Sequence, residues 1–310
     1  MSEPQPVSEP RPGPRHAPAK VNLLLRVGPR RADGYHAVDT ILLALGLADE
    51  ISFSAADTPG LEVRGDTTVP AGEDNLCWRA QRLFGDRVPA AGAKPQRIHL
   101  QKRIPAGAGL GGGSSDAAAV LLALNEAFGE PLTAKQLAGL GAELGSDVPF
   151  FLSGSVLAAG SDRGQEVEPL PAPPPRPVLV LVPGFGIATA DAYGWLDEDR
   201  GPDPAPRATA GVAPDPRTAL ADWEHLAALA ANDFEAPVFR RHPILELGKS
   251  HLLDAGASVA LLCGSGSCLF GVFESSGARD QAAHRIPATA SGEPAFRAIL
   301  THTRDPSEPG

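Results

Sequence analysis

The segment from Pro105 to Ser115, PAGAGLGGGSS, constrains the fold of this chain more than any other. Five of its eleven residues are glycine, and an apolar, alanine-rich segment, DAAAVLLALN, follows it directly. Glycine at this density costs conformational entropy, so we expect unusual backbone angles or close approach to another group. A helix that begins here would offer free N–H groups and a positive dipole end to a phosphate. The segment therefore indicates a phosphorylated ligand.

Several known types of phosphate loop can be excluded from the residues around these glycines. Gly107, Gly109 and Gly112 satisfy the pattern GxGxxG, but the acidic residue that a dinucleotide fold places after its second strand is missing. No lysine follows the glycines as in a Walker loop, and the protein-kinase signatures are absent. The remaining reading is a loop that binds phosphate through backbone amides and the hydroxyl of Ser114 or Ser115. The structural alternative is a glycine loop that only packs closely on a neighbour.

Composition limits the partners of the chain. Its 310 residues are 43% hydrophobic and 21% charged, as in a globular protein, and its formal net charge is −10. A negative charge of this size argues against binding to nucleic acid or to an anionic membrane. Cys77, Cys263 and Cys268 have neither disulfide nor zinc spacing. The first twenty residues resemble neither a signal nor a transit peptide, and no apolar run is long enough to span a membrane, so we expect a soluble, cytoplasmic protein.

The order of the expected elements favours an α+β fold over a doubly wound sheet, because strands and helices do not alternate regularly. Apolar and alternating segments predict strands at residues 21–27, 38–47, 51–55, 61–65, 96–102 and 177–183, and a strand, glycine turn and strand over 257–273. Helical patterns cover residues 75–84, 114–128, 133–144, 219–230 and 243–253, and Thr133 is a plausible N-cap. The segment from Gly145 is expected to be a tight loop that runs into a strand.

The distribution of proline predicts two domains. PAPPPRP at Pro171–Pro177 is the expected boundary, between an N-terminal domain over residues 16–170 and a C-terminal domain over residues 171–303. Residues 1–15 and 304–310 are expected to be tails, the first of them disordered. Residues 198–217 are rich in proline and charge and predict a mobile surface loop.

Three blocks of sequence resemble the GHMP small-molecule kinase superfamily. They are Pro18–Thr40, Lys102–Asn125 together with GSDVPFF from Gly145, and Leu261–Phe273, so the resemblance covers residues 16 to 275. It implies an N-terminal ATP-binding domain, a C-terminal α/β sandwich domain, and an active site in the cleft between them.

The resemblance implies two catalytic residues and an ATP site. Asp147 stands at the position of the catalytic aspartate, which accepts the proton of the attacking hydroxyl, although such a residue is also common in turns. Lys20 stands at the position of the catalytic lysine and would offset charge on the transferred phosphoryl group, although a lysine at a strand start is usually solvated. Magnesium is expected with ATP, and its ligands are not assigned. The ATP-binding residues would be Pro105, Ala106, Gly107, Ala108, Gly109, Leu110, Gly111, Gly112, Gly113, Ser114 and Ser115.

The sequence DGYH resembles the segment that marks one branch of the superfamily, and this resemblance implies phosphorylation of a small molecule with a cytidine diphosphate group, in the non-mevalonate route to isoprenoid precursors. Tyr35 and Tyr193 would stack on the base, His36 would bind its edge, and Asn22 would orient the substrate. Thr189 and Asp191 would line the same site, and a turn at residues 264–266 would approach the phosphates. The alternatives are a GHMP kinase for homoserine, mevalonate or a sugar, or a regulatory relative without activity. The sequence leaves open a monomer or a homodimer.

Four residues depart from the pattern of the superfamily. Ala108 replaces a usual glycine, which costs little if its φ is negative. Asp116 stands where asparagine is common, and a carboxylate there suits the helix dipole but opposes a phosphate. Cys263 and Ser146 replace a hydroxyl residue and an alanine, respectively.

Overall fold

A computed structural model describes residues 12–66, 68–92, 94–162, 164–201, 222–288 and 292–307 of the chain. The strands are β1 (Arg15–Arg30), β2 (His36–Ala55), β3 (Gly60–Arg64), β4 (Gln96–Gln101), β5 (Leu157–Ser161), β6 (Glu166–Leu170), β7 (Pro177–Pro183), β8 (Ala231–Asn232), β9 (Val259–Leu262), β10 (Leu269–Val272) and β11 (Phe296–His302). The helices are α1 (Leu76–Arg87), α2 (Pro89–Gly92), α3 (Gly112–Ala127), α4 (Ala134–Leu144), α5 (Val148–Leu152), α6 (Thr189–Arg200), α8 (Trp223–Leu229), α9 (Glu235–Arg241), α10 (Pro243–Asp254) and α11 (Ser276–His284).

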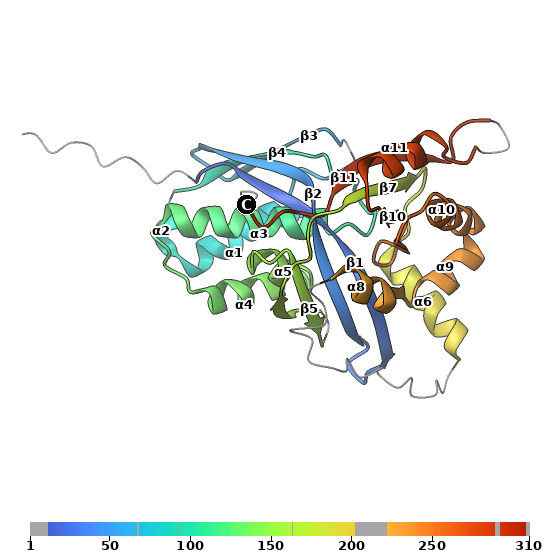
Figure 1. Ribbon diagram of the computed structural model, residues 1–310. Helices are drawn as coiled ribbons and strands as arrows, with labels where there is room; N and C mark the ends of the chain where they lie inside the picture. The colour runs from blue at the N-terminus through green and yellow to red at the C-terminus, as the bar shows by residue number, and fades with distance from the viewer. Residues whose placement is uncertain are drawn as a thin grey trace, which may run out of the picture.

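A long antiparallel hairpin, β1 and β2, forms the centre of the larger sheet. The strand order is β3-β4-β2-β1-β8, with β5 also paired to β2 and β6 paired to β5. The hairpin lies between the helices α1 to α5 on one side and the second sheet with its helices on the other (Figure 1). Leu42 and Ala44 face the helices and pack with residues of α3, whereas Ile41 and Leu43 face the second sheet. Burial on both faces explains why these strands read as continuous apolar runs.

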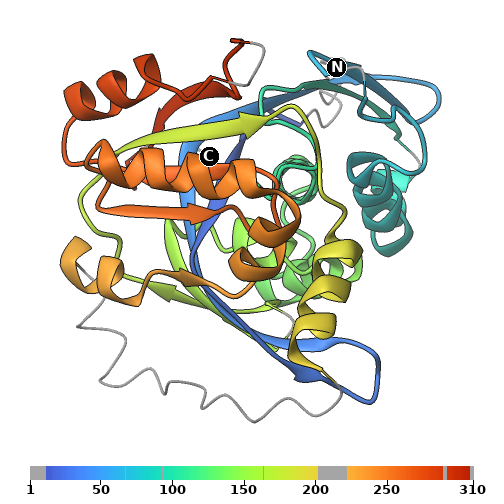
Figure 2. The same ribbon diagram turned by 90° about the vertical axis from the view of Figure 1, so that its right-hand side faces the viewer.

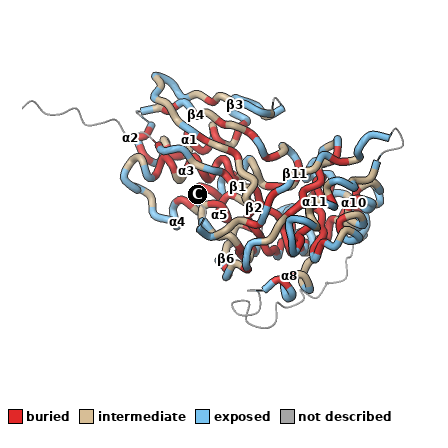
Figure 3. Tube along the Cα trace, turned by 45° about the horizontal axis from the view of Figure 1, so that its top comes forward, coloured by how far each residue is buried: buried red, intermediate tan, exposed pale blue. Residues whose placement is uncertain are grey.

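The second sheet has the order β11-β7-β10-β9, and all its neighbours are antiparallel. Alternate side chains of β7 face opposite layers: Val178 and Val180 pack toward the β1–β2 hairpin, and Leu179 and Leu181 pack toward the helices. Figure 2 shows α10 lying across β9 and β10, with α11 beside it. The chain thus forms successive layers of helices, sheet, sheet and helices, and buried residues concentrate along β1, β2 and α3 in the middle of the molecule (Figure 3).

The α+β prediction is confirmed, and most predicted elements are present with small changes in their ends. The two strands predicted at 38–47 and 51–55 are one strand, β2, because the polar break at Asp49 is not a turn: its carboxylate is buried and paired with Lys102. Thr133 caps α4 in a capping box. The loop predicted after Gly145 contains the short helix α5, and the prediction missed α2, β6, α6, β8, α9, α11 and β11. Helix α6 buries only Ala192 and Leu196, so its apolar periodicity is weak.

The predicted domain boundary remains a prediction, and segments of the C-terminal half return to the larger sheet. Strand β8 pairs with β1 at Leu24 and Leu25, and Thr303 forms a bridge with Leu45. Residues 198–200 of the predicted mobile loop are the last turn of α6, and residues 202–217 lie outside the described residues, as do 1–11 and 308–310 of the predicted tails. Among the helices in the described ranges, none is both long and apolar enough to cross a membrane.

Candidate active site

The glycine-rich segment connects β4 to α3 and has the backbone that its composition predicts. Gly107, Gly109 and Gly111 have φ angles of 66°, 78° and 71°, a conformation that glycine adopts at little cost. Gly111 is the N-cap of α3, so the loop ends at free helix N–H groups. Ala108 is not among the residues with positive φ, and its departure from glycine therefore causes no strain.

A second glycine turn, between β9 and β10, packs directly against this loop. A Cβ atom on Gly109 would lie 1.8 Å from the carbonyl oxygen of Cys263 and 3.0 Å from that of Gly266. A Cβ on Gly264 would lie 3.2 Å from the oxygen of Gly109 and 3.4 Å from the Nζ atom of Lys20. The two turns thus meet backbone to backbone, and the second turn reaches the amine of Lys20.

Lys20 and Asp147 form an ion pair between the two glycine turns. Lys20 lies on β1, and its side chain is only 6% exposed, while Asp147 is the N-cap residue of α5 and its side chain is 33% exposed. The Nζ atom of Lys20 lies 3.2 Å from Oδ2 of Asp147. The Asp147 side chain makes no capping hydrogen bond, so the ordinary role of an aspartate at this position does not explain it.

Asn22 completes the polar group around Lys20. Its Oδ1 atom accepts a hydrogen bond from Lys20 Nζ at 2.9 Å, and its Nδ2 atom donates to Oγ1 of Thr40 at 2.8 Å. Thr40 donates in turn to the carbonyl oxygen of Leu24 at 2.7 Å. All three polar side chains are buried, so this chain of hydrogen bonds holds the lysine amine in one direction.

The ion pair lines the first of two adjoining cavities. The first, of about 590 Å³, is lined by Lys20, Asn22, Asp147, Thr189, Tyr193, the turn at 264–265, Pro105, and residues 107–114 of the glycine loop. The second, of about 760 Å³, is lined by Arg30, Tyr35, His36, Asp197, Thr189, Tyr193 and residues of α4. Thr189 and Tyr193 line both, so the cavities form one cleft with a glycine-rich end and an aromatic end.

The aromatic end of the cleft is built from the β1–β2 turn and from α6. The rings of His36 and Tyr193 lie 5.1 Å apart, and Tyr193 contacts Phe234 edge to face at 4.8 Å. Burial, with the nearby charge of Asp147, raises the pKa of Tyr193 to about 12. Tyr35 is 56% exposed and stands at the edge of the cavity. The ring that contacts Tyr193 at this end is therefore that of His36, and Tyr35 lies farther out.

Nδ1 of His36 lies 2.9 Å from the carbonyl oxygen of Gly28. A carbonyl only accepts hydrogen bonds, so this contact places a proton on Nδ1 and leaves Nε2 directed to the cleft. Nε2 lies 3.4 Å from Oδ2 of Asp197 on α6. The imidazole is thus fixed through Nδ1 by the backbone of Gly28, and its Nε2 atom faces the carboxylate of Asp197.

A buried ionic triad lies beneath the glycine loop. The Nζ atom of Lys102 contacts the carboxylates of Asp49 and Asp116, the latter at 2.8 Å. Asp49 also accepts hydrogen bonds from the backbone N–H groups of Arg103 and Ile104, which lead into the loop. Burial raises the pKa of Asp116 to about 8, opposed by Lys102 and assisted by Asp49. Burial lowers the pKa of Lys102, but the charges of Asp116 and Asp49 outweigh this effect and raise it overall.

The structure brings most of the predicted site residues into this cleft and leaves three outside. Ala106 and Ser115 do not line the glycine-rich cavity; Ser115 is buried on the other side of α3, and its N–H group bonds within the helix. Asp191 lines neither cavity. Thr40, Asp197 and the Lys102 triad were missed. A polar residue within a strongly apolar strand was the available signal for Thr40 and Asp49.

Two parts of the chain match kinase families. Residues 75–155 match the family described as GHMP kinases N terminal domain, and residues 217–292 match GHMP kinases C terminal. With the paired glycine turns and the Lys20–Asp147 pair, these matches define the class of the protein as a GHMP small-molecule kinase. Relatives named 4-diphosphocytidyl-2-C-methyl-D-erythritol kinase are similar over most of the chain. The one from Anaeromyxobacter dehalogenans is 44% identical over 92% of this chain and 88% of its own length.

The relative of the same name from Solibacter usitatus is also 44% identical, over 82% of this chain and 79% of its own length. A crystal structure of 4-(cytidine 5'-diphospho)-2C-methyl-D-erythritol kinase superimposes with a TM-score of 0.74 at 36% identity, and covers 94% of this chain and all of that one. The chain belongs to the 4-diphosphocytidyl-2-C-methyl-D-erythritol kinase family. Homoserine kinase from Cytophaga hutchinsonii, at 19% identity and a TM-score of 0.63 over 93% of this chain and 95% of its own, shares the fold.

Proposed function

We propose that this protein transfers the γ-phosphoryl group of ATP to the 2-hydroxyl of 4-diphosphocytidyl-2-C-methyl-D-erythritol, a step of the non-mevalonate route to isoprenoid precursors. The observation that carries the proposal is the Lys20–Asp147 pair, 3.2 Å apart, between the glycine loop and the aromatic end of the cleft. The names of the relatives support the choice of acceptor. A cytoplasmic location and a monomeric or homodimeric state belong to the same proposal.

The glycine-rich end of the cleft is the proposed site of the ATP phosphates. The loop, with its positive φ angles, and the first residues of α3 line this cavity, so free backbone N–H groups lie beside it. The dipole of α3 favours negative charge at this N-terminus. A Cβ on Gly107 would meet nothing within 4 Å, so this glycine leaves open space on the cavity side. Lys20 adds a positive charge at the end of this space.

The reaction assigns separate roles to the two members of the ion pair. The 2-hydroxyl oxygen forms the new bond to the γ-phosphorus, the bond from that phosphorus to the bridging oxygen breaks, and ADP leaves. Asp147 accepts the proton that the hydroxyl loses. An ammonium has three donors, and two directions are taken by Asn22 and Asp147, so the third serves the oxygens of the transferred group.

Hard oxygen donors in the cleft fit a magnesium ion bound with ATP. The Asp147 carboxylate lines the cavity together with Ser114, whose hydroxyl lies beside Gly145. Magnesium takes one or two protein oxygens together with phosphate and water, which matches this small donor set. When bound, it would neutralise charge on the β- and γ-phosphates. Within the described ranges no cluster of three or more His, Cys, Asp or Glu residues forms a metal site of its own.

The aromatic end of the cleft is the proposed site of the cytosine base. The exposed ring of Tyr35 and the His36–Tyr193 pair offer flat surfaces on which a base can stack. Thr189 lines both cavities, and Asn22 lies beside Lys20 in the glycine-rich one, where the acceptor hydroxyl must meet the phosphoryl group. This arrangement favours an acceptor with a nucleotide group over homoserine or mevalonate.

The proposal is tested by ADP release from ATP with each of four acceptors: the cytidyl substrate, homoserine, mevalonate and galactose. We expect turnover only with the cytidyl substrate. Asp147→Asn should lower kcat by about 10²–10⁴-fold, because proton transfer to a positioned base contributes that much. Lys20→Ala should lower kcat on the order of 10²-fold or more, through lost stabilisation of the transferred group. Asp191→Asn, a nearby carboxylate outside both cavities, is the matched control and should keep the wild-type rate.

Turnover of homoserine or mevalonate alone would assign a different GHMP kinase activity. Binding of ATP without turnover of any acceptor would favour a regulatory relative. An undiminished rate in Asp147→Asn would remove this carboxylate as the base.

A further inference from the structure

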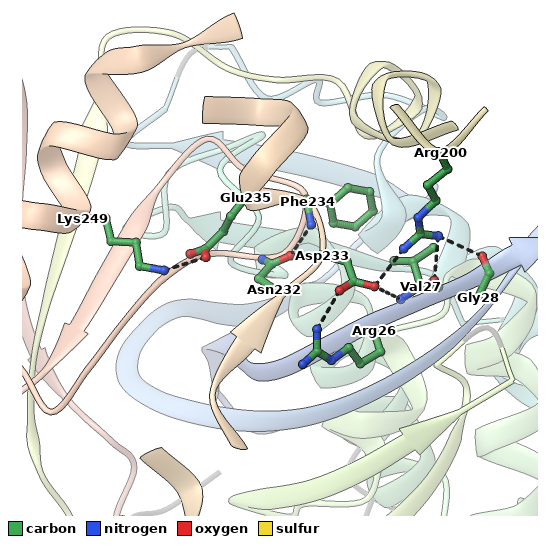
Figure 4. A network of polar contacts seen from close by, with 9 residues as sticks. All are labelled: Arg26, Val27, Gly28, Arg200, Asn232, Asp233, Phe234, Glu235 and Lys249. Atoms are coloured by element: carbon green, nitrogen blue, oxygen red, sulfur yellow. Dashed lines mark hydrogen bonds and ion pairs between the residues drawn. The ribbon is translucent and has the colours of Figure 1, made fainter. Parts of the chain in front are cut away.

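A buried carboxylate, Asp233, joins three elements behind the aromatic end of the cleft. Its side chain is 1% exposed and lies between β8 and α9. Oδ1 accepts from Arg26 at 2.9 Å, and Oδ2 accepts from Arg200 at 2.9 Å and from the N–H group of Val27 at 3.0 Å. Figure 4 shows the carboxylate between the two guanidinium groups, with Arg26 reaching it from β1 and Arg200 from α6. No member of this network enters the chemistry proposed above.

Arg200 connects this carboxylate to the backbone that holds His36. Its Nη1 atom donates to the carbonyl oxygen of Val27 at 2.7 Å and, more weakly, to that of Gly28 at 3.4 Å. The oxygen of Gly28 is also the acceptor for Nδ1 of His36. Arg200 is the last residue of α6, the helix that carries Tyr193. A single side chain therefore ties the helix of Tyr193 to the β1 backbone that holds the ring of His36, which contacts Tyr193.

Asn232 and Phe234, on either side of Asp233 in the sequence, contact two other parts of the cleft. Nδ2 of Asn232 donates to the carbonyl oxygens of Leu262 and Gly264, at 2.9 and 2.7 Å, and so holds the second glycine turn. The ring of Phe234 packs on Tyr193. Residues 232–234 thus support the phosphate end and the aromatic end from one place in the chain.

We propose that Arg200 and Asp233 are positioning residues that set the placement of the His36–Tyr193 ring pair by locking α6 to the end of β1. This inference rests on the proposed function, because it assigns to that ring pair the recognition of a nucleoside diphosphate acceptor. The forked geometry of arginine is needed, since one guanidinium serves two carbonyl oxygens and a carboxylate at once. Loss of this network should weaken binding of the acceptor rather than of ATP, because the contacts of Arg200 go to Val27, Gly28 and Asp233 and not to the first glycine loop.

The test compares Arg200→Ala and Arg200→Lys with Arg241→Ala as the matched control. Arg241 also joins α9 to α6, through an exposed pair with Glu198 on the outer surface. KM for the cytidyl acceptor, KM for ATP and kcat are measured, with the Kd of CDP alone by calorimetry and thermal unfolding of each variant. In Arg200→Ala we expect KM for the acceptor and Kd for CDP to rise about tenfold or more, and KM for ATP to change less than twofold.

Arg200→Lys keeps the charge beside Asp233 but cannot reach both carbonyl oxygens, so we expect a rise of about threefold or more. If Arg200→Ala does not fold, the Arg200→Lys variant alone tests whether Arg200 controls binding of the acceptor. Arg241→Ala should match the wild type in every binding measurement. Equal rises in both KM values, unchanged CDP binding in folded Arg200 variants, or the same effect in Arg241→Ala would each overturn the inference. Failure of the wild type to phosphorylate any cytidine-containing acceptor would instead refute the proposed function.

Discussion

Two glycines of the loop, Gly107 and Gly109, allow a direct test of how the two glycine turns depend on each other. Both have positive φ, 66° and 78°, so an alanine at either position costs about 1–2 kcal/mol of stability in the left-handed region. Their surroundings differ, because a Cβ on Gly107 meets nothing within 4 Å, whereas one on Gly109 lies 1.8 Å from the oxygen of Cys263. Gly107→Ala therefore isolates the backbone cost, and Gly109→Ala adds the clash.

The size of the clash sets the expected effects. The Cys263 oxygen must retreat by roughly 1.5 Å to reach an ordinary C···O contact of about 3.3 Å, and forcing a packed region apart adds about 1–3 kcal/mol. At about 2 °C for each kcal/mol in a chain of this size, we expect Tm to fall by roughly 2–4 °C in Gly107→Ala and roughly 4–10 °C in Gly109→Ala. The displaced turn also contacts Lys20, so kcat/KM in Gly109→Ala should fall on the order of 100-fold.

The stability difference is measured by thermal unfolding in the absence of nucleotide. Gly107 lines the cavity proposed for ATP, so its substitution can also weaken ATP binding, and bound ATP would then change Tm by a different amount in each variant. Steady-state ADP release measures the catalytic effect. Equal losses of Tm in the two variants would refute the reasoning, because they would mean that the contact between the turns adds nothing to the backbone cost.

Two further outcomes follow from the buried groups of the site. Burial raises the pKa of Asp116 from an ordinary 3.8 to about 8, so between these pH values the folded state retains a proton that the unfolded state releases, and stability falls as the pH rises. Asp116→Asn removes this dependence of stability on pH. The Tm of the variant minus that of the wild type should therefore rise between pH 4 and pH 8, by the equivalent of roughly a few kcal/mol. A Tm difference that stays constant with pH would contradict the burial argument. Tyr193→Ala should raise KM for the acceptor about tenfold while Tyr193→Phe, which keeps the ring, stays within about threefold; equal effects would show that the ring surface is not used.

Much of the candidate site could be predicted from local sequence. The glycines at 107, 109 and 111 are required by their own backbone angles, and the helix after them follows from its apolar run. Thr133 satisfies its capping box with Gln136, three residues away. Lys20 and Asp147 were assigned from a resemblance to a family, and the structure adds that Asp147 is turned away from capping and toward Lys20.

Other features could not be predicted because their partners are far apart in the chain. Asp233 is 206 residues from Val27 and 33 from Arg200, and nothing local indicates that one carboxylate joins them. Asp49 lies between two predicted strands that are in fact one, and Lys102, which lies 53 residues away, neutralises its charge within the core. The contact between the rings of His36 and Tyr193 also depends on distant segments, and the hairpin turn leaves Tyr35 exposed, while the stacking of Tyr35 and Tyr193 on a base stays a prediction.

The sequence by itself determined the glycine-rich end of the cleft, which we propose for the ATP phosphates, because glycine spacing and a following helix control backbone conformation over a few residues. It also determined the class of mixed strands and helices. Only the tertiary structure decided how the aromatic end of the cleft is formed, because the β1–β2 hairpin, α6 and the segment at 232–234 meet through buried polar contacts and ring packing. Such contacts are stable only where packing excludes water and every buried donor and acceptor finds a partner, a condition that belongs to the whole fold.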